Sequence, residues 1–382
     1  MTQTLPTATP HPWTAENAEA LLTGMLNIFT PSGAERPLAE WLCEQMRPLG
    51  FTVEMDAVGN FIGTLPATVA EPTAPCVLLG HMDTVAGEIP VRREGDLLYG
   101  RGAVDAKGPL AAFLAATVQV AHLDVPRQRP IIIVGAVEEE AATSRGARAV
   151  LDRWRPAYTV IGEPSGAHAV TLGYKGRLLV TYRAEQSVIH TARPEEGVCM
   201  RGIAFWLAVR QAATEWNALY ATINGQASQF AMVAPTLRAM QSGSDGFTDW
   251  CELTIGYRLP PEYEIADLQA WLVREALATG GKVTCRGAEV AFQTVPSGRL
   301  VSAFVRGMRT EQLSPAFKRK TGTSDMNVVG PIWQCPILAY GPGDAALDHT
   351  PNEHINLTEY HQGIAVLTHV LRDLVTERQD RG

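Results

Sequence analysis

Residues 76–84 read CVLLGHMDT, and this stretch decides the fold class. The run 76–79 is short and apolar and follows a Pro-punctuated loop, so it predicts a buried strand. His81 and Asp83 come directly after this strand, at the position where open α/β sheets present side chains to a ligand. The stretch therefore predicts a functional edge of an α/β sheet.

The same pattern recurs along the chain. Apolar runs predict further buried strands at residues 131–137, 158–161 and 337–340. Helices are predicted between the strands, one opened by Pro109 and one at about residues 144–154. Strands that alternate with helices in this way indicate an α/β fold with a mainly parallel sheet.

The predicted strands and helices follow a different order over residues 175–293. Predicted strands and helices follow one another there as β-α-β-β-α-β, which is typical of a small ferredoxin-like domain. The sequence after this segment returns to the first style. We therefore predict a discontinuous catalytic domain of residues 1–174 and 294–382, with an inserted domain of residues 175–293.

Composition excludes several classes of protein. The 382 residues carry 32 Lys plus Arg against 40 Asp plus Glu, a net charge of -8 that argues against nucleic-acid binding. A disordered chain is excluded because 46% of residues are apolar and 19% are charged. The six cysteines form no C-x-x-C pair, and the run 109–123 is too short to span a bilayer. Without a signal-peptide pattern at the start, we expect a cytoplasmic protein that binds no membrane.

Three more acidic clusters are candidates for chemistry. Asp105 lies in the Gly-rich loop GRGAVDAKG, where it replaces the third Gly of a dinucleotide fingerprint, so the loop favours an inward-pointing carboxylate over a nucleotide. The run 138–140 reads EEE directly after a predicted strand, and Glu163 follows the next one. Adjacent carboxylates can give one group to a metal and leave the other as a general base.

Together these positions predict a metal site. Two imidazoles and three carboxylates are expected at the carboxyl ends of strands in one layer, namely His81, Asp105, Glu140, Glu163 and His349. Nitrogen and oxygen ligands without thiolate suit zinc, cobalt or manganese. If one carboxylate bridges, five ligands suffice for two metals about 3.5 to 4 Å apart. Serine chemistry has no comparable support, since no G-x-S-x-G motif occurs.

The ordered motifs GHMDT, YGRGAVDAKGP, EEE, IGEPS and HTPNE resemble those of the co-catalytic zinc aminoacylase and carboxypeptidase family. This family includes acetylornithine deacetylase and succinyl-diaminopimelate desuccinylase, and the resemblance covers nearly the whole chain. It implies a zinc-peptidase-like catalytic domain and a lid domain that forms a homodimer. It also implies two divalent metals per subunit, zinc first and cobalt as the alternative.

The resemblance also implies roles for the candidate ligands. His81 and Glu163 would hold one side of the metal pair, and Glu140 and His349 the other. Asp105 would bridge the two metals.

Further roles follow from the same resemblance. Asp83 would orient the imidazole of His81, and His190, in a stretch similar to H-S-x-x-P, would stabilise the oxyanion. Glu139 would be the general base, although Glu138 and Glu139 remain an alternative pair for base and ligand. His354 is likewise a second candidate beside His349.

A narrower likeness concerns the substrate. YGRGAVDAKGPLAAF, VGAVEEE, LGYKGRL and KTGTSDMNV resemble hydrolases that free lysine or ornithine from the side-chain carboxyl of the terminal Glu of an acidic amino-group carrier protein. Deacylation of acetylornithine, desuccinylation or dipeptide hydrolysis remains the alternative. Candidate substrate contacts are Arg258, Thr323, Ser324 and Asp325. An acidic carrier also needs a basic face, for which residues 92–93 and 318–320 are candidates.

Overall fold

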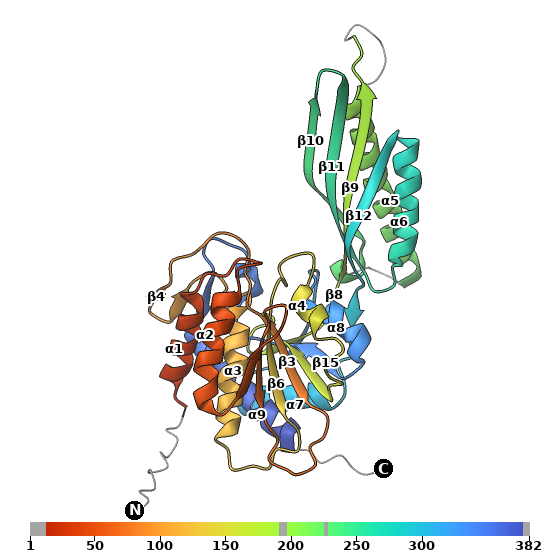
Figure 1. Ribbon diagram of the computed structural model, residues 1–382. Coiled ribbons are helices and arrows are strands. Elements are labelled where there is room, and N and C mark those ends of the chain that lie inside the picture. The colour runs from red at the N-terminus through yellow and green to blue at the C-terminus, as the bar shows by residue number, and fades with distance from the viewer. Residues whose placement is uncertain (1–12, 191–196, 225–227, 377–382) are drawn as a thin grey trace, which may run out of the picture. The chain divides into compact units, whose positions relative to one another are not determined.

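The computed structural model describes residues 13–190, 197–224 and 228–376. The chain forms two compact units (Figure 1). The first unit comprises Met1–Leu172, Thr294–Lys318 and Val328–Gly382, and the second comprises Gly173–Gln293 and Arg319–Asn327. We refer to them as the first and second unit.

A nine-stranded sheet lies mainly in the first unit, although its last strand, Phe292–Gln293, is counted with the second unit. Its order is β1-β2-β6-β3-β7-β15-β8-β13, with β14 beside β8. The four central strands β6, β3, β7 and β15 are mutually parallel, whereas the outer strands are antiparallel. The strands are β1 (Thr52–Met55), β2 (Phe61–Leu65), β3 (Cys76–His81), β6 (Ile131–Ala136), β7 (Tyr158–Ile161), β8 (Ala169–Tyr174), β13 (Phe292–Gln293), β14 (Ala316–Lys320) and β15 (Ile337–Ala339).

This arrangement confirms the predicted α/β fold with a mostly parallel central sheet. Every residue of β3, β6 and β7 is buried, as is usual for parallel strands that are covered on both faces. A second, three-stranded sheet has the order β16-β5-β4. Its strands are β4 (Arg92–Glu94), β5 (Leu97–Tyr99) and β16 (His354–Asn356).

Most helices of the first unit share one apolar core with the sheet, namely those within residues 15–46, 107–121, 299–310 and 357–376. Helix α3 is apolar on all sides, and it is buried against β3, β6 and the C-terminal helix α9 (Figure 1). Thr14 caps α1 through a capping box. The helices are α1 (Ala15–Leu26), α2 (Arg36–Met46), α3 (Lys107–Ala121), α4 (Arg145–Ala149), α7 (Arg299–Thr310), α8 (Asp325–Trp333) and α9 (Leu357–Thr376), and the short 3-10 turns are η1 (Arg47–Leu49) and η3 (Ala345–Leu347).

The predicted helix at residues 144–154 is wrong in length. Only Arg145–Ala149 is α-helical, because the next amides bond three residues back rather than four. The amides of Val150, Leu151 and Arg153 make these tighter bonds. Sequence analysis did not predict α7 and α8.

The second unit is one sheet with two helices. Its elements follow along the chain as β9 (Gly176–Ser187), α5 (Val198–Asn224), η2 (Gln229–Ala231), β10 (Ala234–Ser244), β11 (Thr248–Leu259), α6 (Ile265–Ala278) and β12 (Gly281–Glu289). The antiparallel strands have the order β10-β11-β9-β12. Helices α5 and α6 cover one face of this sheet, where alternate strand residues form a separate apolar core (Figure 1).

In the described part of the chain, no helix combines the length and apolarity needed to cross a bilayer. All six cysteines are free thiols.

Candidate metal centre

The five predicted ligands lie at one edge of the central sheet in the first unit. His81 ends β3, whereas Glu140 and Glu163 follow β6 and β7. Because these strands are parallel neighbours, their carboxyl ends meet at the same edge. Asp105 lies just before α3, and His349 lies between η3 and β16. The fold thus brings together side chains that are up to 268 residues apart in sequence.

Two glycines allow the Asp105 loop to reach this edge. Gly102 has a φ of 89°, in the left-handed region where glycine is favoured. At Gly108 a Cβ atom would lie 2.2 Å from the carbonyl oxygen of Ala103, so any side chain there would displace the loop. The loop therefore depends on the glycine content noted in the sequence.

The side chains form two potential metal-binding groups. His81, Asp105 and Glu163 form one, and Asp105, Glu140 and His349 form the other, with the ligand atoms of each within 4.8 Å of one another. Asp105 belongs to both groups. Asp105 therefore lies where a carboxylate shared by two cations would have to lie.

The distances within the cluster suit two cations. Asp105 Oδ1 lies 3.2 Å from His81 Nε2, and its Oδ2 lies 3.0 Å from His349 Nε2. His81 Nε2 is 3.9 Å from Glu163 Oε1. Two donors bound at about 2.1 Å by a tetrahedral zinc ion lie about 3.4 Å apart, so these spacings and the nitrogen–oxygen donor set fit zinc.

Neighbouring carboxylates raise the pKa values of both histidines in the cluster. Burial would lower the pKa of His81, but hydrogen bonds to Asp105 and Asp83 and the charge of Glu139 raise it well above its ordinary value. Hydrogen bonds to Asp105 and Glu140 raise the pKa of His349 to about 10. Protons on the imidazoles therefore balance the carboxylates when no cation does so, and a cation must displace these protons to bind.

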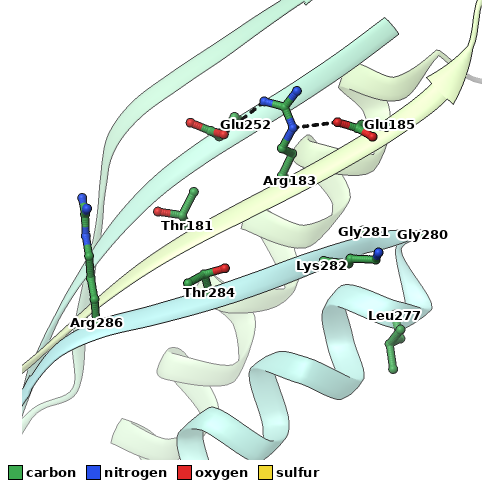
Figure 2. A pocket seen from close by; sticks show the side chains of 10 residues that line it. All are labelled: Thr181, Arg183, Glu185, Glu252, Leu277, Gly280, Gly281, Lys282, Thr284 and Arg286. Carbon is green, nitrogen blue, oxygen red and sulfur yellow. Dashed lines mark hydrogen bonds and ion pairs between the residues drawn. The ribbon is translucent and has the colours of Figure 1, made fainter. Parts of the chain in front are cut away.

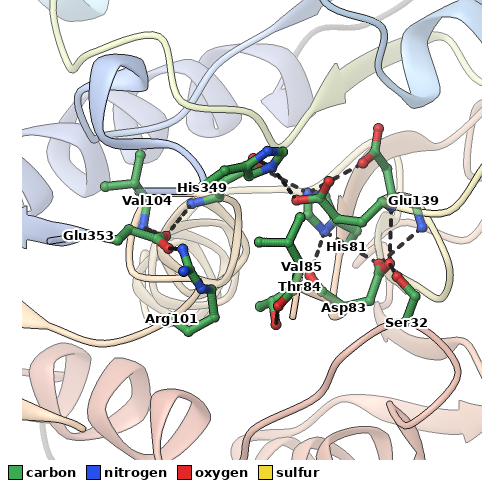
Figure 3. Close-up of polar contacts among 12 residues, drawn as sticks. Ser32, His81, Asp83, Thr84, Val85, Arg101, Val104, Glu139, His349 and Glu353 are labelled. Carbon is green, nitrogen blue, oxygen red and sulfur yellow. Dashed lines mark hydrogen bonds and ion pairs between the residues drawn. The ribbon is translucent and has the colours of Figure 1, made fainter. Parts of the chain in front are cut away.

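The backbone positions His81. Its Nδ1 lies 2.9 Å from the carbonyl oxygen of Asp83 and 3.5 Å from the Asp83 carboxylate. Because a carbonyl only accepts, Nδ1 carries a proton, and Nε2 is the ring nitrogen that faces the other ligands. Figure 3 shows His81 and His349 directed toward the same space.

The carboxylate of Asp83 has a second contact that sequence reasoning did not predict. It accepts hydrogen bonds from the amides of Glu139 and Glu140, each at 3.0 Å, and from Ser32 Oγ at 2.7 Å. Buried Glu35 similarly accepts from the amide of Glu138 at 3.0 Å. Two buried carboxylates thus hold three successive amides of the EEE run.

The three glutamates of this run point to different places. Glu138 pairs with Arg145 at 2.8 Å and accepts a hydrogen bond from Thr143. Glu139 Oε2 lies 3.9 Å from His81 Nε2, and Glu140 Oε1 lies 2.8 Å from His349 Nε2. Of the two registers that the sequence left open, this geometry favours Glu139 beside the metal space and Glu140 as a ligand.

His354, the second candidate ligand, lies elsewhere. It belongs to β16, its Nδ1 is 2.7 Å from the carbonyl oxygen of Asn352, and its ring packs 4.7 Å from that of Tyr99. Among the described residues, the metal-binding groups include His349 and not His354. His349 has a φ of 60°, a conformation that costs roughly 1–3 kcal/mol for a residue other than glycine.

Glu353 is a buried residue that ties the two ligand loops together. One of its oxygens accepts from the amides of Val104 at 2.9 Å and Asp105 at 3.1 Å, and the other pairs with Arg101 at 2.7 Å (Figure 3). Arg101 also donates to the carbonyl oxygen of Thr350, next to His349. Glu353 stood in the HTPNE motif, but nothing in the sequence indicated that it binds backbone amides.

Replacing Glu353 by Gln is expected to lower the free energy of unfolding by about 3 kcal/mol, because Arg101 then keeps a buried charge without its partner. Metal affinity should fall about 10- to 100-fold, as for other groups that orient ligands. Chemical denaturation and metal titration measure the two effects. The double variant Arg101→Gln/Glu353→Gln should lose less stability than the sum of the single variants, and strict additivity would refute the coupling.

The remaining predicted residues belong to the second unit. His190 is exposed, and residues 191–194 of its motif lie outside the described residues. Arg258 Nη1 donates to Thr323 Oγ1 at 3.1 Å. Ser324 is buried and accepts from the amide of Met326 at the start of α8. The roles of these residues, and of the buried Asp325, stay predictions.

Lys175 is a buried lysine in the second unit that sequence analysis did not single out. Its Nζ donates to the carbonyl oxygens of Gln229 at 3.1 Å and of Met232. Burial first, and the charge of Arg258 second, lower the pKa of Lys175 from 10.5 to about 8. Between these values the unfolded chain binds one more proton than the folded chain, so this lysine makes stability rise with pH.

Replacing Lys175 by Met is expected to reduce the rise in stability between about pH 8 and pH 10 relative to the wild type. Urea denaturation at a series of pH values measures this difference. The matched control is Lys282→Met, since Lys282 is exposed in the same unit. Equal pH slopes for Lys175→Met and the wild type would contradict the assignment.

The chain matches known proteins along most of its length. Residues 77–373 match the model of peptidase family M20/M25/M40. The chain is 41% identical to LysW-lysine hydrolase of Deinococcus radiodurans, over 96% of this chain and 99% of that protein. It is 28% identical to LysW-lysine/LysW-ornithine hydrolase of Sulfurisphaera tokodaii, over 94% and 96% of the two chains.

Solved structures agree in fold. An M20 family metallo-carboxypeptidase from Sulfolobus solfataricus superposes with a TM-score of 0.75 at 16% identity, over 93% of this chain and 98% of that one. The match to the family model confirms the family resemblance expected from the ordered motifs. The family model covers most of the sequence, and the chain belongs to peptidase family M20/M25/M40.

Proposed function

We propose that this protein is a metal-dependent amide hydrolase that releases lysine or ornithine from an amino-group carrier protein. One observation carries the proposal: the five ligands form two groups that share Asp105, in a chain 41% identical to a LysW-lysine hydrolase along nearly its whole length. The scissile bond is the amide between the amino acid and the side-chain carboxyl of the carrier's terminal Glu.

The proposed site holds two divalent cations, with zinc as the first choice and cobalt as the alternative. His81 and Glu163 would hold one, Glu140 and His349 would hold the other, and Asp105 would be shared. When bound, such cations lower the pKa of water toward 7 and polarise an amide carbonyl. The mixed imidazole and carboxylate donors support this assignment.

Glu139 is the proposed general base. Its carboxylate lies beside His81, and its amide is fixed by Asp83, so it can take a proton from attacking water and return it to the leaving amine. His190 is proposed to donate a hydrogen bond to the oxyanion. Arg258 is proposed to bind the substrate carboxylate. Thr323, Ser324 and Asp325 are proposed to line the site of the leaving amino acid, with Asp325 as the partner of its ammonium group.

We further propose that the second unit is a ferredoxin-like lid through which two copies dimerise. Its helices expose large apolar side chains, which marks a surface that another protein covers. These include Met200, Leu207 and Leu219 on α5 and Val273 on α6. Light scattering of the purified protein tests the dimer.

The free thiols support a cytoplasmic location.

Hydrolysis of lysine-loaded carrier tests the function. Purified enzyme should release lysine, lose activity after treatment with a chelator, and regain it with added zinc or cobalt. Acetylornithine serves as the comparison substrate. Faster turnover of acetylornithine than of loaded carrier would replace this proposal by a small-molecule deacylase.

A further inference from the structure

One face of the sheet in the second unit carries an excess of positive charge. Strand residues that point away from α5 and α6 include six cations against three carboxylates, a net charge of +3 in a chain of net charge -8. The cations are Arg177, Arg183, Arg238, Arg258, Lys282 and Arg286, and the carboxylates are Glu185, Glu252 and Glu289. We refer to this surface as the basic sheet face.

Strand register places these residues on one face. Leu178, Val180 and Tyr182 of β9 point into the helix-covered core, so Arg183 and its alternate neighbours point the other way. Lys282 lies opposite Arg183 in the register of β12 and β9, and therefore on the same face. Arg238 of β10 joins them, because its side chain lies over Gly256.

Within the described ranges, half of these cations lack an acidic partner. Arg183 is neutralised by Glu185 at 2.8 Å and Glu252 at 3.2 Å (Figure 2). In contrast, Arg238, Lys282 and Arg286 are exposed and make no ion pair with any described residue. Uncompensated cations on one face produce a local positive potential that attracts an acidic partner.

The shape of the basic sheet face suits a protein partner. An open groove of about 810 Å³ runs over β9 and β12, and Figure 2 shows Arg286 standing up from the sheet beside it. Thr181 and Thr284 are paired in register and form its floor. Small hydroxyl side chains there let another surface approach closely, while the cations stand around it.

The basic pair predicted from the sequence at residues 92–93 is less suitable. Arg92 pairs with Glu94 at 2.8 Å, and Arg93 pairs with Glu19 at 2.6 Å. Both charges are therefore already compensated. Residues 318–320 lie on β14, where Lys318 donates to the carbonyl oxygen of Ser165.

We propose that the basic sheet face docks the acidic carrier protein, an inference that rests on the proposed function. An enzyme with a net charge of -8 repels an acidic partner as a whole, so docking needs a local face of opposite charge. The basic sheet face meets that need, whereas the apolar side chains on α5 and α6 suit a second copy of this chain.

The test compares a carrier substrate with a small one. The hydrolysis of lysine-loaded carrier protein and of the isopeptide γ-glutamyl-lysine is compared between wild type and Lys282→Glu/Arg286→Glu. For loaded carrier, KM is expected to rise roughly tenfold with kcat unchanged, because such charges act mainly on association. Hydrolysis of the dipeptide should not change. Added salt should weaken turnover of loaded carrier in the wild type more than in the variant.

The matched control is Arg47→Glu/Arg372→Glu, which makes the same change in net charge at exposed positions of the first unit. It should keep the wild-type KM for loaded carrier. An unchanged KM for loaded carrier in Lys282→Glu/Arg286→Glu would overturn the docking proposal. If light scattering then showed a changed oligomeric state, the basic sheet face would be a contact between copies of this chain instead. If wild type cleaves the dipeptide but not loaded carrier, the proposed function itself fails.

Discussion

Replacing Glu139 by Gln is expected to lower kcat by about 10²- to 10⁴-fold, the usual contribution of a general base. The backbone amide at this position can still bond to Asp83, so the loop should keep its place, but the new side chain cannot take a proton. Both cations should remain bound, because Glu139 belongs to neither metal-binding group. Steady-state kinetics and metal analysis of the same preparation measure the two effects.

The neighbouring Glu138 provides the control. Its carboxylate is occupied by Arg145 and Thr143, so Glu138→Gln should keep kcat near that of the wild type. Any loss there should appear in stability instead. If Glu138→Gln lost as much turnover as Glu139→Gln, the register of base and ligand would be wrong.

The ligands at strand ends could be predicted from the sequence, whereas the separate roles of the three glutamates in the EEE run could not. His81 and Glu163 follow apolar runs that form buried strands, and parallel strands necessarily bring such positions to one edge. Within the EEE run, however, composition cannot tell which carboxylate points inward. That depends on Glu138, whose φ of 56° turns the chain, and on the amide contacts of Asp83 and Glu35.

Carboxylates that bind backbone amides also escaped prediction. Glu35 and Glu353 are almost fully buried, yet their partners lie about 100 and 250 residues away. The hydrophobic periodicity of a sequence does not indicate contacts between residues so far apart in the chain. The antiparallel direction of the outer strands also escaped prediction, because short apolar runs do not reveal the direction in which a strand pairs.

Substitutions of the ligands are expected to separate the two cation sites. His349→Ala removes an imidazole that belongs only to the group of Asp105, Glu140 and His349. This variant should therefore bind about one cation per subunit instead of two. Asp105→Ala removes the shared carboxylate, so both affinities should fall. In each case turnover should fall on the order of a thousandfold, because Lewis-acid stabilisation is worth several kcal/mol and each 1.36 kcal/mol is tenfold.

His354→Ala is the matched control for His349→Ala, since it removes an imidazole from the same segment but from outside the cluster. It should keep both cations and nearly all activity. Metal content after dialysis and isothermal titration with zinc distinguish the three variants. Because a cation that binds only the folded state stabilises it, zinc should also raise the Tm of His354→Ala as it does for the wild type, and that of Asp105→Ala far less. Two full-strength zinc sites in Asp105→Ala would contradict a shared carboxylate, since the cluster would then be two independent sites rather than one pair.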